Sequence, residues 1–179
     1  GVINSWPQSL SAKHKKKIIK LMKACQEVMS GYIKSEELRG IQMAKLDVKW
    51  RGLEECGAGS IWPSFSQALN TYLSAHTDED FFYSLLTLAS AHALRDDIDK
   101  YKMDAEVSNY FVFPEHGVAV ALRPGDMLLF NPKYQHCLSS RTSAYSKEDV
   151  YSLSLYLKSA VVGKNDNSIP LSKTESDLL

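Results

Sequence analysis

The sequence predicts an α+β protein: a β-sandwich or barrel that follows an N-terminal helical region, with the helices packed on one of its faces. Three observations favour this fold class. A lysine-rich segment near the N-terminus has the periodicity of an amphipathic helix, short apolar or alternating segments follow from residue 70 onward, and turn sequences separate several of these segments. Alternating strand and helix units, which would indicate a parallel sheet, are not visible.

Residues 9–31 are expected to form the first helix, with Ser9 or Ser11 as its N-cap and Gly31 at its end. Apolar residues recur here at spacings of three and four: Ile18, Leu21, Met22, Cys25, Val28 and Met29. Lysines fall mostly on the other faces: Lys13, Lys15, Lys16, Lys17, Lys20 and Lys23. Such a run is typical of a solvent-exposed helix face. The alternative interpretation is a patch that contacts phosphate groups.

The elements after this helix are shorter. We expect a second, weaker helix at 35–45, a loop at 51–63 and a short helix at 64–69. Seven short strands are predicted at 70–75, 81–89, 107–113, 117–122, 126–131, 135–140 and 150–161. We accordingly divide the chain into a helical support region (1–68), a β core (69–162) and a polar tail (163–179).

The composition is that of one ordinary globular domain. Of 179 residues, 44% are hydrophobic and 23% are charged, which is enough for a single sizeable core. The formal net charge is zero, so no overall field would attract nucleic acid or an anionic membrane. No apolar run approaches the roughly 20 residues of a transmembrane helix, and we expect no membrane association. The oligomeric state stays open.

The cysteines indicate a cellular compartment. The chain has three of them, an odd number without any CxxC pairing: Cys25, Cys56 and Cys137. This usage argues against a disulfide scaffold and against a thiolate zinc site. The N-terminus also lacks the apolar segment of a signal peptide. We therefore expect an intracellular protein, in the cytoplasm or nucleus, rather than a secreted one.

The segment SAHTDEDFFYSLLTL places His76 and Asp78 at the mouth of an apolar strand. Residues i and i+2 of an extended segment project to the same side, so both side chains can converge on one point. An imidazole and a carboxylate suit a divalent iron, manganese or zinc ion, and His136 in RPGDMLLFNPKYQHC is the candidate third ligand. Two histidines and one carboxylate leave three positions of a metal open, as O2-activating non-haem iron requires.

With these residues in place, residues 69–160 resemble the non-haem iron, 2-oxoglutarate-dependent dioxygenases. The motif of that family is HxD, then a distal histidine, then a basic residue on the last strand. His76-Thr77-Asp78 and His136 match its first two parts, and GDMLLFNP resembles the family's strand after a Gly-Asp turn. Within the family the chain looks closest to the prolyl-hydroxylase-like group and to the nucleic-acid oxidases of the TET and J-binding-protein kind.

The resemblance implies a double-stranded β-helix, or jelly roll, as the catalytic core. It implies that His76, Asp78 and His136 hold Fe(II), that 2-oxoglutarate and O2 are cosubstrates, and that the metal centre hydroxylates a C–H bond of a macromolecule. That macromolecule is either a nucleic acid, contacted at a base, or a protein, contacted at a side chain. Four residues could line the substrate pocket or be ordinary core: Tyr83, Asn109, Tyr110 and Tyr156.

The chain departs from the family on its last strand. In the family an arginine or lysine at the start of this strand anchors 2-oxoglutarate. In DVYSLSLYLK that position holds Val150 or Ser152, neither of which is charged. Basic substitutes are Arg141, Lys147 and Lys158, of which Arg141 is the first choice because it is near His136 and permanently charged. The alternative for Arg141 is a solvent-facing loop residue. The departure also favours a second function, a non-catalytic or structural-metal binding module on the same fold.

Overall fold

The computed structural model describes residues 2–5, 11–32, 62, 64–81, 83–90 and 106–159. The chain forms two compact units. The first comprises residues 1–5 and 64–156, and the second comprises residues 6–63 and 157–179. Each unit is described below by itself.

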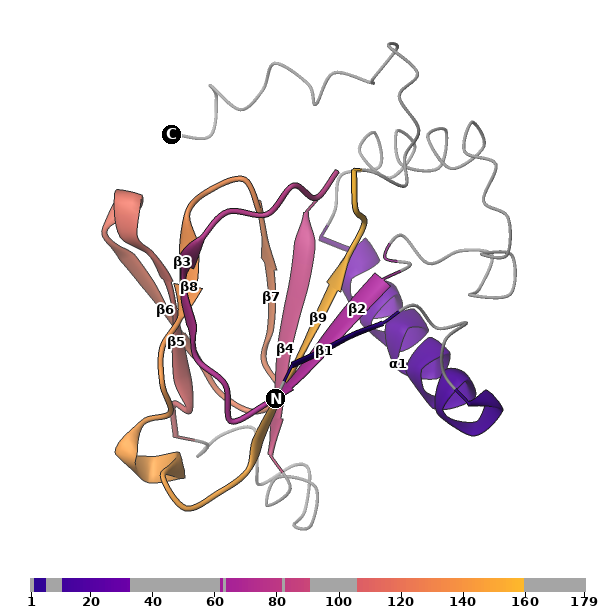
Figure 1. The fold of residues 1–179 in the computed structure, drawn as a ribbon, viewed down its shortest axis with the longest axis horizontal. Coiled ribbons are helices and arrows are strands. Elements are labelled where there is room, and N and C mark those ends of the chain that lie inside the picture. Colours follow the sequence, from indigo (N-terminus) through magenta and orange to yellow (C-terminus); the bar gives the residue numbers. More distant parts are fainter. Residues whose placement is uncertain are drawn as a thin grey trace. The chain divides into compact units, whose positions relative to one another are not determined.

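The described part of the first unit is mostly β and consists of two antiparallel sheets (Figure 1). The five-stranded sheet has the order β1 (Val2–Ser5), β2 (Ser64–Leu69), β9 (Val150–Tyr156), β4 (Ser84–Ser90) and β7 (Met127–Phe130). The four-stranded sheet has the order β3 (Leu73–His76), β8 (His136–Leu138), β5 (Asn109–Phe113) and β6 (Val118–Leu122). From β2 to β9 every connection crosses from one sheet to the other, except the β5–β6 hairpin.

The hydrophobic core lies between these two sheets, since it collects side chains from both. Its buried members are Leu86, Leu88, Phe111, Leu122, Phe130, Leu138, Tyr145 and Val150. The side chains of strand β9 alternate between the two faces of the sheet, as the sequence predicts. Val150 belongs to this core, whereas Leu155 is paired with Leu85 on the other face of the sheet, where both are fully buried. Ser152 therefore shares the inner face with Val150.

The predicted RPGD turn is present and leads into β7. Gly125 has φ 93°, a left-handed conformation that suits glycine at this position of a tight turn, and its N–H donates to the carbonyl of Leu88. Asp126 closes the turn, because its carboxylate accepts a hydrogen bond from the N–H of Arg123. The β-strand after the turn is thereby aligned against β4, with Thr87 opposite Met127.

In the second unit, helix α1 spans Ala12–Ser30 and confirms the predicted first helix. Ser11 is its N-cap without a side-chain cap hydrogen bond, and Gly31 is its C-cap in an ordinary right-handed conformation. One side of α1 is buried through Ile18, Met22, Cys25 and Met29. No helix in the described ranges is long and apolar enough to cross a membrane.

One predicted element is wrong. Residues 64–69 form strand β2 rather than a short helix, and they pair with β9 on one side and β1 on the other. Six residues are too few for periodicity to separate a helix from a strand, and pairing on both edges decided the outcome. The helix predicted at 35–45 and the tail at 163–179 lie outside the described residues. The packing of helices on one sheet stays a prediction.

Candidate metal centre

The two histidines of the candidate site face each other across a pair of strands. His76 ends β3 and His136 begins β8, and the two residues are direct partners in the antiparallel register. Their ring centroids lie 4.5 Å apart. His136 is buried, whereas His76 is half-exposed, so the pair has one side in the interior and one side open. The fold therefore joins residues that are far apart in the sequence.

Asp78 completes the group from the segment after β3. Its N–H donates to the carbonyl of Pro132 over 2.9 Å, which ties this segment to the turn between β7 and β8. Its carboxylate Oδ2 lies 3.5 Å from Nε2 of His136 and 3.8 Å from Nε2 of His76. The three donor atoms all fall within 4.8 Å of one another. No other such group of three occurs among the described residues.

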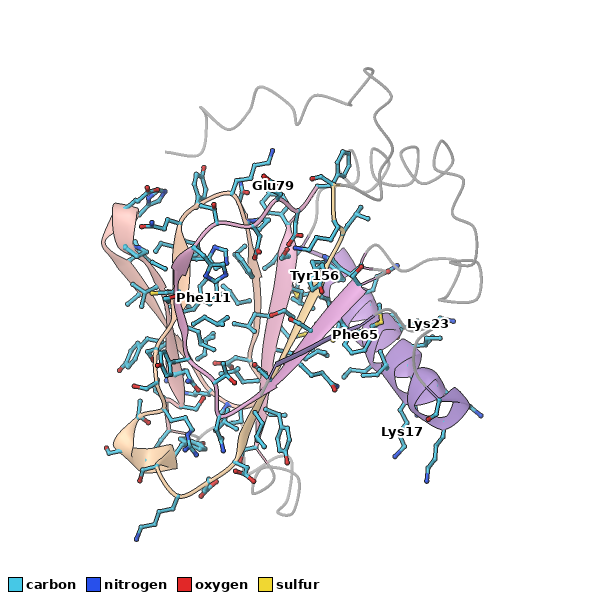
Figure 2. All side chains as sticks on the ribbon, viewed as in Figure 1. Lys17, Lys23, Phe65, Glu79, Phe111 and Tyr156 are labelled. Carbon is cyan, nitrogen blue, oxygen red and sulfur yellow. The ribbon has the colours of Figure 1, made fainter. Side chains whose placement is uncertain are left out.

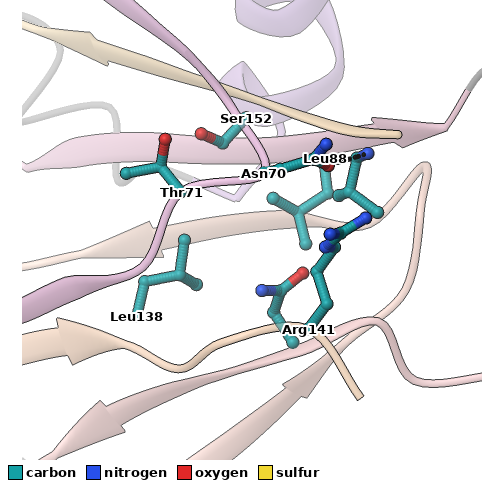
Figure 3. Close-up of a pocket in the computed structure, with 8 residues that line it drawn as sticks. Asn70, Thr71, Leu88, Leu138, Arg141 and Ser152 are labelled. Atoms are coloured by element: carbon teal, nitrogen blue, oxygen red, sulfur yellow. Dashed lines mark hydrogen bonds between the residues drawn. The ribbon is translucent and has the colours of Figure 1, made fainter. Parts of the chain in front are cut away.

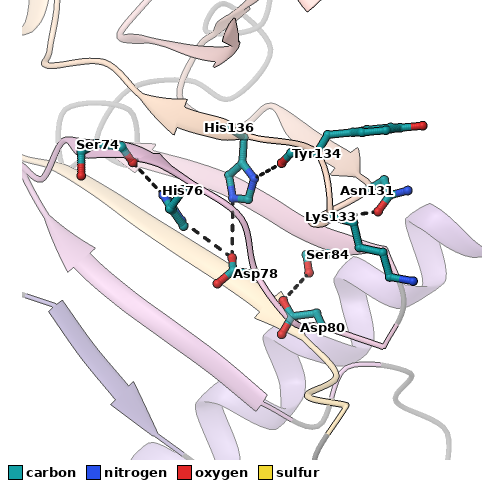
Figure 4. Close-up of polar contacts among 9 residues, drawn as sticks. All are labelled: Ser74, His76, Asp78, Asp80, Ser84, Asn131, Lys133, Tyr134 and His136. Carbon is teal, nitrogen blue, oxygen red and sulfur yellow. Dashed lines mark hydrogen bonds and ion pairs between the residues drawn. The ribbon is translucent and has the colours of Figure 1, made fainter. Parts of the chain in front are cut away.

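The hydrogen bonds of the two imidazoles determine which nitrogen faces the centre of the group (Figure 4). Nδ1 of His76 is 2.7 Å from the carbonyl oxygen of Ser74, and Nδ1 of His136 is 2.8 Å from that of Tyr134. A carbonyl oxygen only accepts, so Nδ1 carries the proton in each ring. In the neutral imidazoles, Nε2 then presents its lone pair toward Asp78. Metal-binding histidines have this arrangement, in which the other ring nitrogen donates to a carbonyl or carboxylate.

This donor set fits a divalent metal ion. Two imidazole nitrogens and a carboxylate oxygen suit iron, manganese or zinc. Ligands held at about 2.1 Å from one ion at right angles lie about 3 Å apart. The two separations from Asp78 are 3.5 and 3.8 Å, and all three donor atoms lie within 4.8 Å, so small side-chain movements would bring them to one ion. The three ligands also come from one side, the strand pair β3–β8 and the segment that follows β3.

Aromatic rings form the interior wall of the site. Phe111 stacks on His136, with the ring centroids 5.3 Å apart and an interplanar angle of 16°. Phe130 meets the same imidazole edge-on at 4.9 Å. These contacts exclude water from the inner side of His136 and hold its ring in a fixed orientation. Nearby, the carboxylate of buried Asp80 accepts a hydrogen bond of 2.9 Å from the hydroxyl of Ser84.

A second aromatic group continues from this wall to the surface. Phe113 lies 5.3 Å from Phe111, and its ring is followed by those of His116 and Tyr134, which lie 4.8 Å apart. The sequence alone did not reveal this group. The contact joins the β5–β6 turn to the segment before β8, and no local sequence pattern specifies such a long-range contact. The carbonyls of Ser74 and Tyr134 also have no sequence signal, because every residue carries one.

Arg141 and Ser152 lie together at a small pocket between the sheets (Figure 3). Asn109 lines it as well, together with Asn70, Thr71, Leu88, Leu138 and Val150. Its cavity volume is about 10 Å³, room for roughly one water molecule. Asn109 is buried, and while its Nδ2 donates to the carbonyl of Ser139, its Oδ1 accepts no hydrogen bond within the described residues.

The guanidinium group of Arg141 is partly engaged by its own loop. Nη1 donates to the carbonyl oxygens of Tyr145 and Glu148. An arginine has five N–H donors. Those on Nε and Nη2 make no hydrogen bond within the described residues. Arg141 is therefore half-buried beside the pocket rather than an ordinary solvent-facing loop residue.

The other predicted site residues are dispersed. Tyr156 is half-buried on β9, and its hydroxyl donates to the carbonyl of Phe65. Tyr83 is half-buried just before β4, and Tyr110 is exposed next to core residue Phe111 on β5. Lys158 belongs to the second unit, and Lys147 is exposed after a 3-10 turn at Ser143–Tyr145. Roles for these residues stay predictions.

The two antiparallel sheets and their common core define a jelly-roll type of fold, which carries a possible metal site of two histidines and an aspartate. No protein-family model matches the sequence, and no curated protein matches it significantly. Among solved structures, the chain is similar to NgTET1 in complex with 5mC DNA, with a TM-score of 0.56 and 14% sequence identity. The match covers 80% of this chain and 49% of NgTET1, so the chain spans about half the length of that protein.

Two further solved structures are less similar. One is a putative mannose-6-phosphate isomerase from Ralstonia eutropha, with a TM-score of 0.34, 10% identity and coverage of 53% of this chain and 73% of that one. The other is an RmlC-like cupin protein from Desulfovibrio desulfuricans, with a TM-score of 0.31, 12% identity and coverage of 51% and 70%. At such low identity, the likeness to NgTET1 concerns the fold alone.

Proposed function

We propose that the protein is a non-haem Fe(II)-dependent dioxygenase that uses 2-oxoglutarate and O2 to hydroxylate a C–H bond of a macromolecule. The observation that carries the proposal is the group of His76, Asp78 and His136, with both Nε2 lone pairs directed to the carboxylate. Two histidines and one carboxylate on one face of a metal characterise O2-activating iron sites. The similarity of the fold to NgTET1 supports the same class.

We further propose that the jelly roll is a double-stranded β-helix. The alternation of successive strands between the two sheets, interrupted at the β5–β6 hairpin, supports this finer description. His76 at the end of β3 and His136 at the start of β8 both stand at strand ends of the four-stranded sheet.

The residues of the chain would have distinct tasks. His76, Asp78 and His136 would hold the ion, and Phe111 and Phe130 would exclude water from its inner side. When bound, Fe(II) with 2-oxoglutarate and O2 supplies the oxidation: one oxygen atom goes to the substrate C–H bond, and 2-oxoglutarate becomes succinate and CO2. Arg141 would donate its remaining N–H groups to the distal carboxylate of 2-oxoglutarate, with the hydroxyl of Ser152 beside it.

The substrate would be either a nucleic acid or a protein. NgTET1 is seen in complex with 5mC DNA, which favours a nucleic-acid base for a chain of similar fold. The open side of the site, next to half-exposed His76, is where such a group would enter. We propose an intracellular location with this function.

A second candidate function is a metal-binding module without oxygenase activity. Two observations favour it. The inner face of β9 carries Val150 and Ser152 where a charged anchor is expected, and the cavity beside Arg141 has a volume of only about 10 Å³. A carboxylate would enter only if neighbouring side chains moved. The metal would then be held for structure or for binding alone.

One experiment separates the two functions. The purified protein is loaded anaerobically with Fe(II), and 2-oxoglutarate is added while the visible absorption spectrum is recorded. The oxygenase is expected to develop a weak metal-to-ligand charge-transfer band and, on exposure to air, to release succinate. Tight Fe(II) binding without a band and without succinate would overturn the oxygenase and leave the binding module.

A further inference from the structure

One face of α1 is an uninterrupted row of positive charge. Five lysines on it are exposed, and together they are called the lysine stripe: Lys13, Lys16, Lys17, Lys20 and Lys23. At 100° per residue these positions fall within a sector of about 120°. Figure 2 shows Lys17 and Lys23 extending outward from the helix. The stripe is about 15 Å long, given a rise of about 1.5 Å per residue.

The opposite side of the helix fixes the direction in which the stripe faces. Ile18, Met22, Cys25 and Met29 are buried and lie about 180° around the helix from the lysines. The helix cannot rotate to hide the stripe without exposing these four apolar side chains. The lysines are therefore held toward solvent together, although the formal net charge of the whole protein is zero.

The stripe opposes the stability of its own helix. Several lysine pairs stand three or four residues apart and repel one another: Lys13–Lys16, Lys13–Lys17, Lys16–Lys20, Lys17–Lys20 and Lys20–Lys23. Lys13 also lies in the first turn of α1, where the helix dipole disfavours positive charge, and this turn contains no acidic residue. An anionic partner along the stripe would remove both penalties.

We propose that the lysine stripe binds the phosphate backbone of a nucleic acid. This inference deepens the proposed function, because it names nucleic acid as the macromolecular substrate. It rests on the proposed function for the oxidation that would follow binding. Along 15 Å, one strand of duplex DNA presents between about four and five phosphate charges, which is close to the number of lysines in the stripe. Lysine ammonium groups act as point charges, which suits backbone contacts that do not depend on sequence.

Two other anionic partners fit less well. A helix that binds a membrane surface inserts its apolar face among the lipids. In α1 that face is buried within the protein. An acidic peptide rarely carries an evenly spaced row of charges of this length, whereas a nucleic acid carries one by its covalent structure.

The test measures binding of the full chain to a fluorescein-labelled 20-base-pair DNA duplex by anisotropy, without added metal, between 50 and 200 mM NaCl. If all five lysines contact phosphates, log Kobs falls with log salt at a slope of about −4.5, so binding weakens about 500-fold over this range. Replacing all five lysines with glutamine is expected to remove most of this slope. Circular dichroism checks that the variant remains folded.

Matched single variants locate the contact. Lys20→Glu and Lys147→Glu each reverse the charge of an exposed lysine, but only Lys20 belongs to the stripe. The first is expected to reduce the slope by about one unit and the second to leave it unchanged. Exposed Glu27 falls within the sector of the stripe, so Glu27→Gln is expected to tighten binding.

Three results would overturn the inference. The five-lysine variant could retain the slope of the unmodified chain, polyglutamate could compete as well as DNA at equal charge, or vesicles with 30% phosphatidylserine could bind while DNA does not. Because DNA binding is measured without metal and the Fe(II) band without DNA, either proposal can fail while the other stands.

Discussion

Nε2 of His136 lies 3.5 Å from Oδ2 of Asp78, although the two residues belong to segments that are distant in the sequence. The hydrogen bond from the Asp78 N–H to the carbonyl of Pro132 fastens the same two segments through the main chain. The candidate site therefore forms only when β3 and β8 are paired in register. Metal binding and the pairing of this sheet should be coupled, because an ion held by all three side chains stabilises the folded state.

His76→Ala and Asp78→Ala are each expected to lower the affinity for Fe(II) by more than about 100-fold, since each removes one of three ligands. Anaerobic titration calorimetry measures this loss. His116→Ala is the matched control, because His116 is an exposed histidine whose ring contacts Tyr134 and which is not one of the three candidate ligands. Unchanged affinity in both ligand variants would remove the metal site from consideration.

Arg141→Ala is expected to reduce stability by about 1.5–3 kcal/mol, because the carbonyls of Tyr145 and Glu148 lose a charged donor. Arg141→Lys keeps the charge and should recover part of this loss. Both variants are expected to weaken 2-oxoglutarate binding. Alanine removes the charge, and lysine cannot reproduce the paired N–H donors of a guanidinium group. Urea denaturation and the Fe(II) charge-transfer band measure the two effects separately. A normal band in Arg141→Ala would exclude Arg141 as the anchor.

Asn70 should be sensitive to substitution because it combines a left-handed backbone with three contacts to the start of β9. Its φ is 52°, its side chain bonds Asp149 and the N–H of Val150, and its own N–H donates to the carbonyl of Val150. Asn70→Ala is expected to cost about 2–4 kcal/mol through two lost hydrogen bonds and an unfavourable φ. Asn70→Gly loses the same bonds without the strain, so it should be about 1 kcal/mol less damaging. Equal losses in thermal unfolding would contradict this explanation.

Cys25 and Cys137 should differ in their reaction with iodoacetamide. Burial raises the pKa of the Cys25 thiol, and the hydrogen bond to the backbone offsets this only in part. A raised pKa keeps the thiol protonated and unreactive at pH 8. Cys137 is half-buried and should be alkylated sooner. Peptide mass spectrometry measures both rates, and rapid labelling of Cys25 in the folded protein would show that this side of α1 opens.

Much of the fold could be predicted because its signals are local. The apolar segments between Leu73 and Tyr156, and the RPGD turn, lie close to the observed strands and turn. Strand β2 could not be predicted, since SFSQAL is short and its pairing with β1 and β9 depends on distant residues. The HxD spacing identified His76 and Asp78 as candidate metal ligands, because an imidazole and a carboxylate two residues apart on an extended segment can reach one ion. The loop carbonyls that engage Arg141 have no counterpart in sequence patterns.

Both imidazoles are oriented by a carbonyl two residues earlier in their own segment, that of Ser74 for His76 and that of Tyr134 for His136. The acceptor of each of these two hydrogen bonds is a main-chain atom. Substitution of Ser74 or Tyr134 therefore leaves the tautomer and direction of each ligand intact. These two hydrogen bonds can persist when residues 74 and 134 differ between related chains, and a comparison that searches for a preserved side-chain acceptor would overlook them.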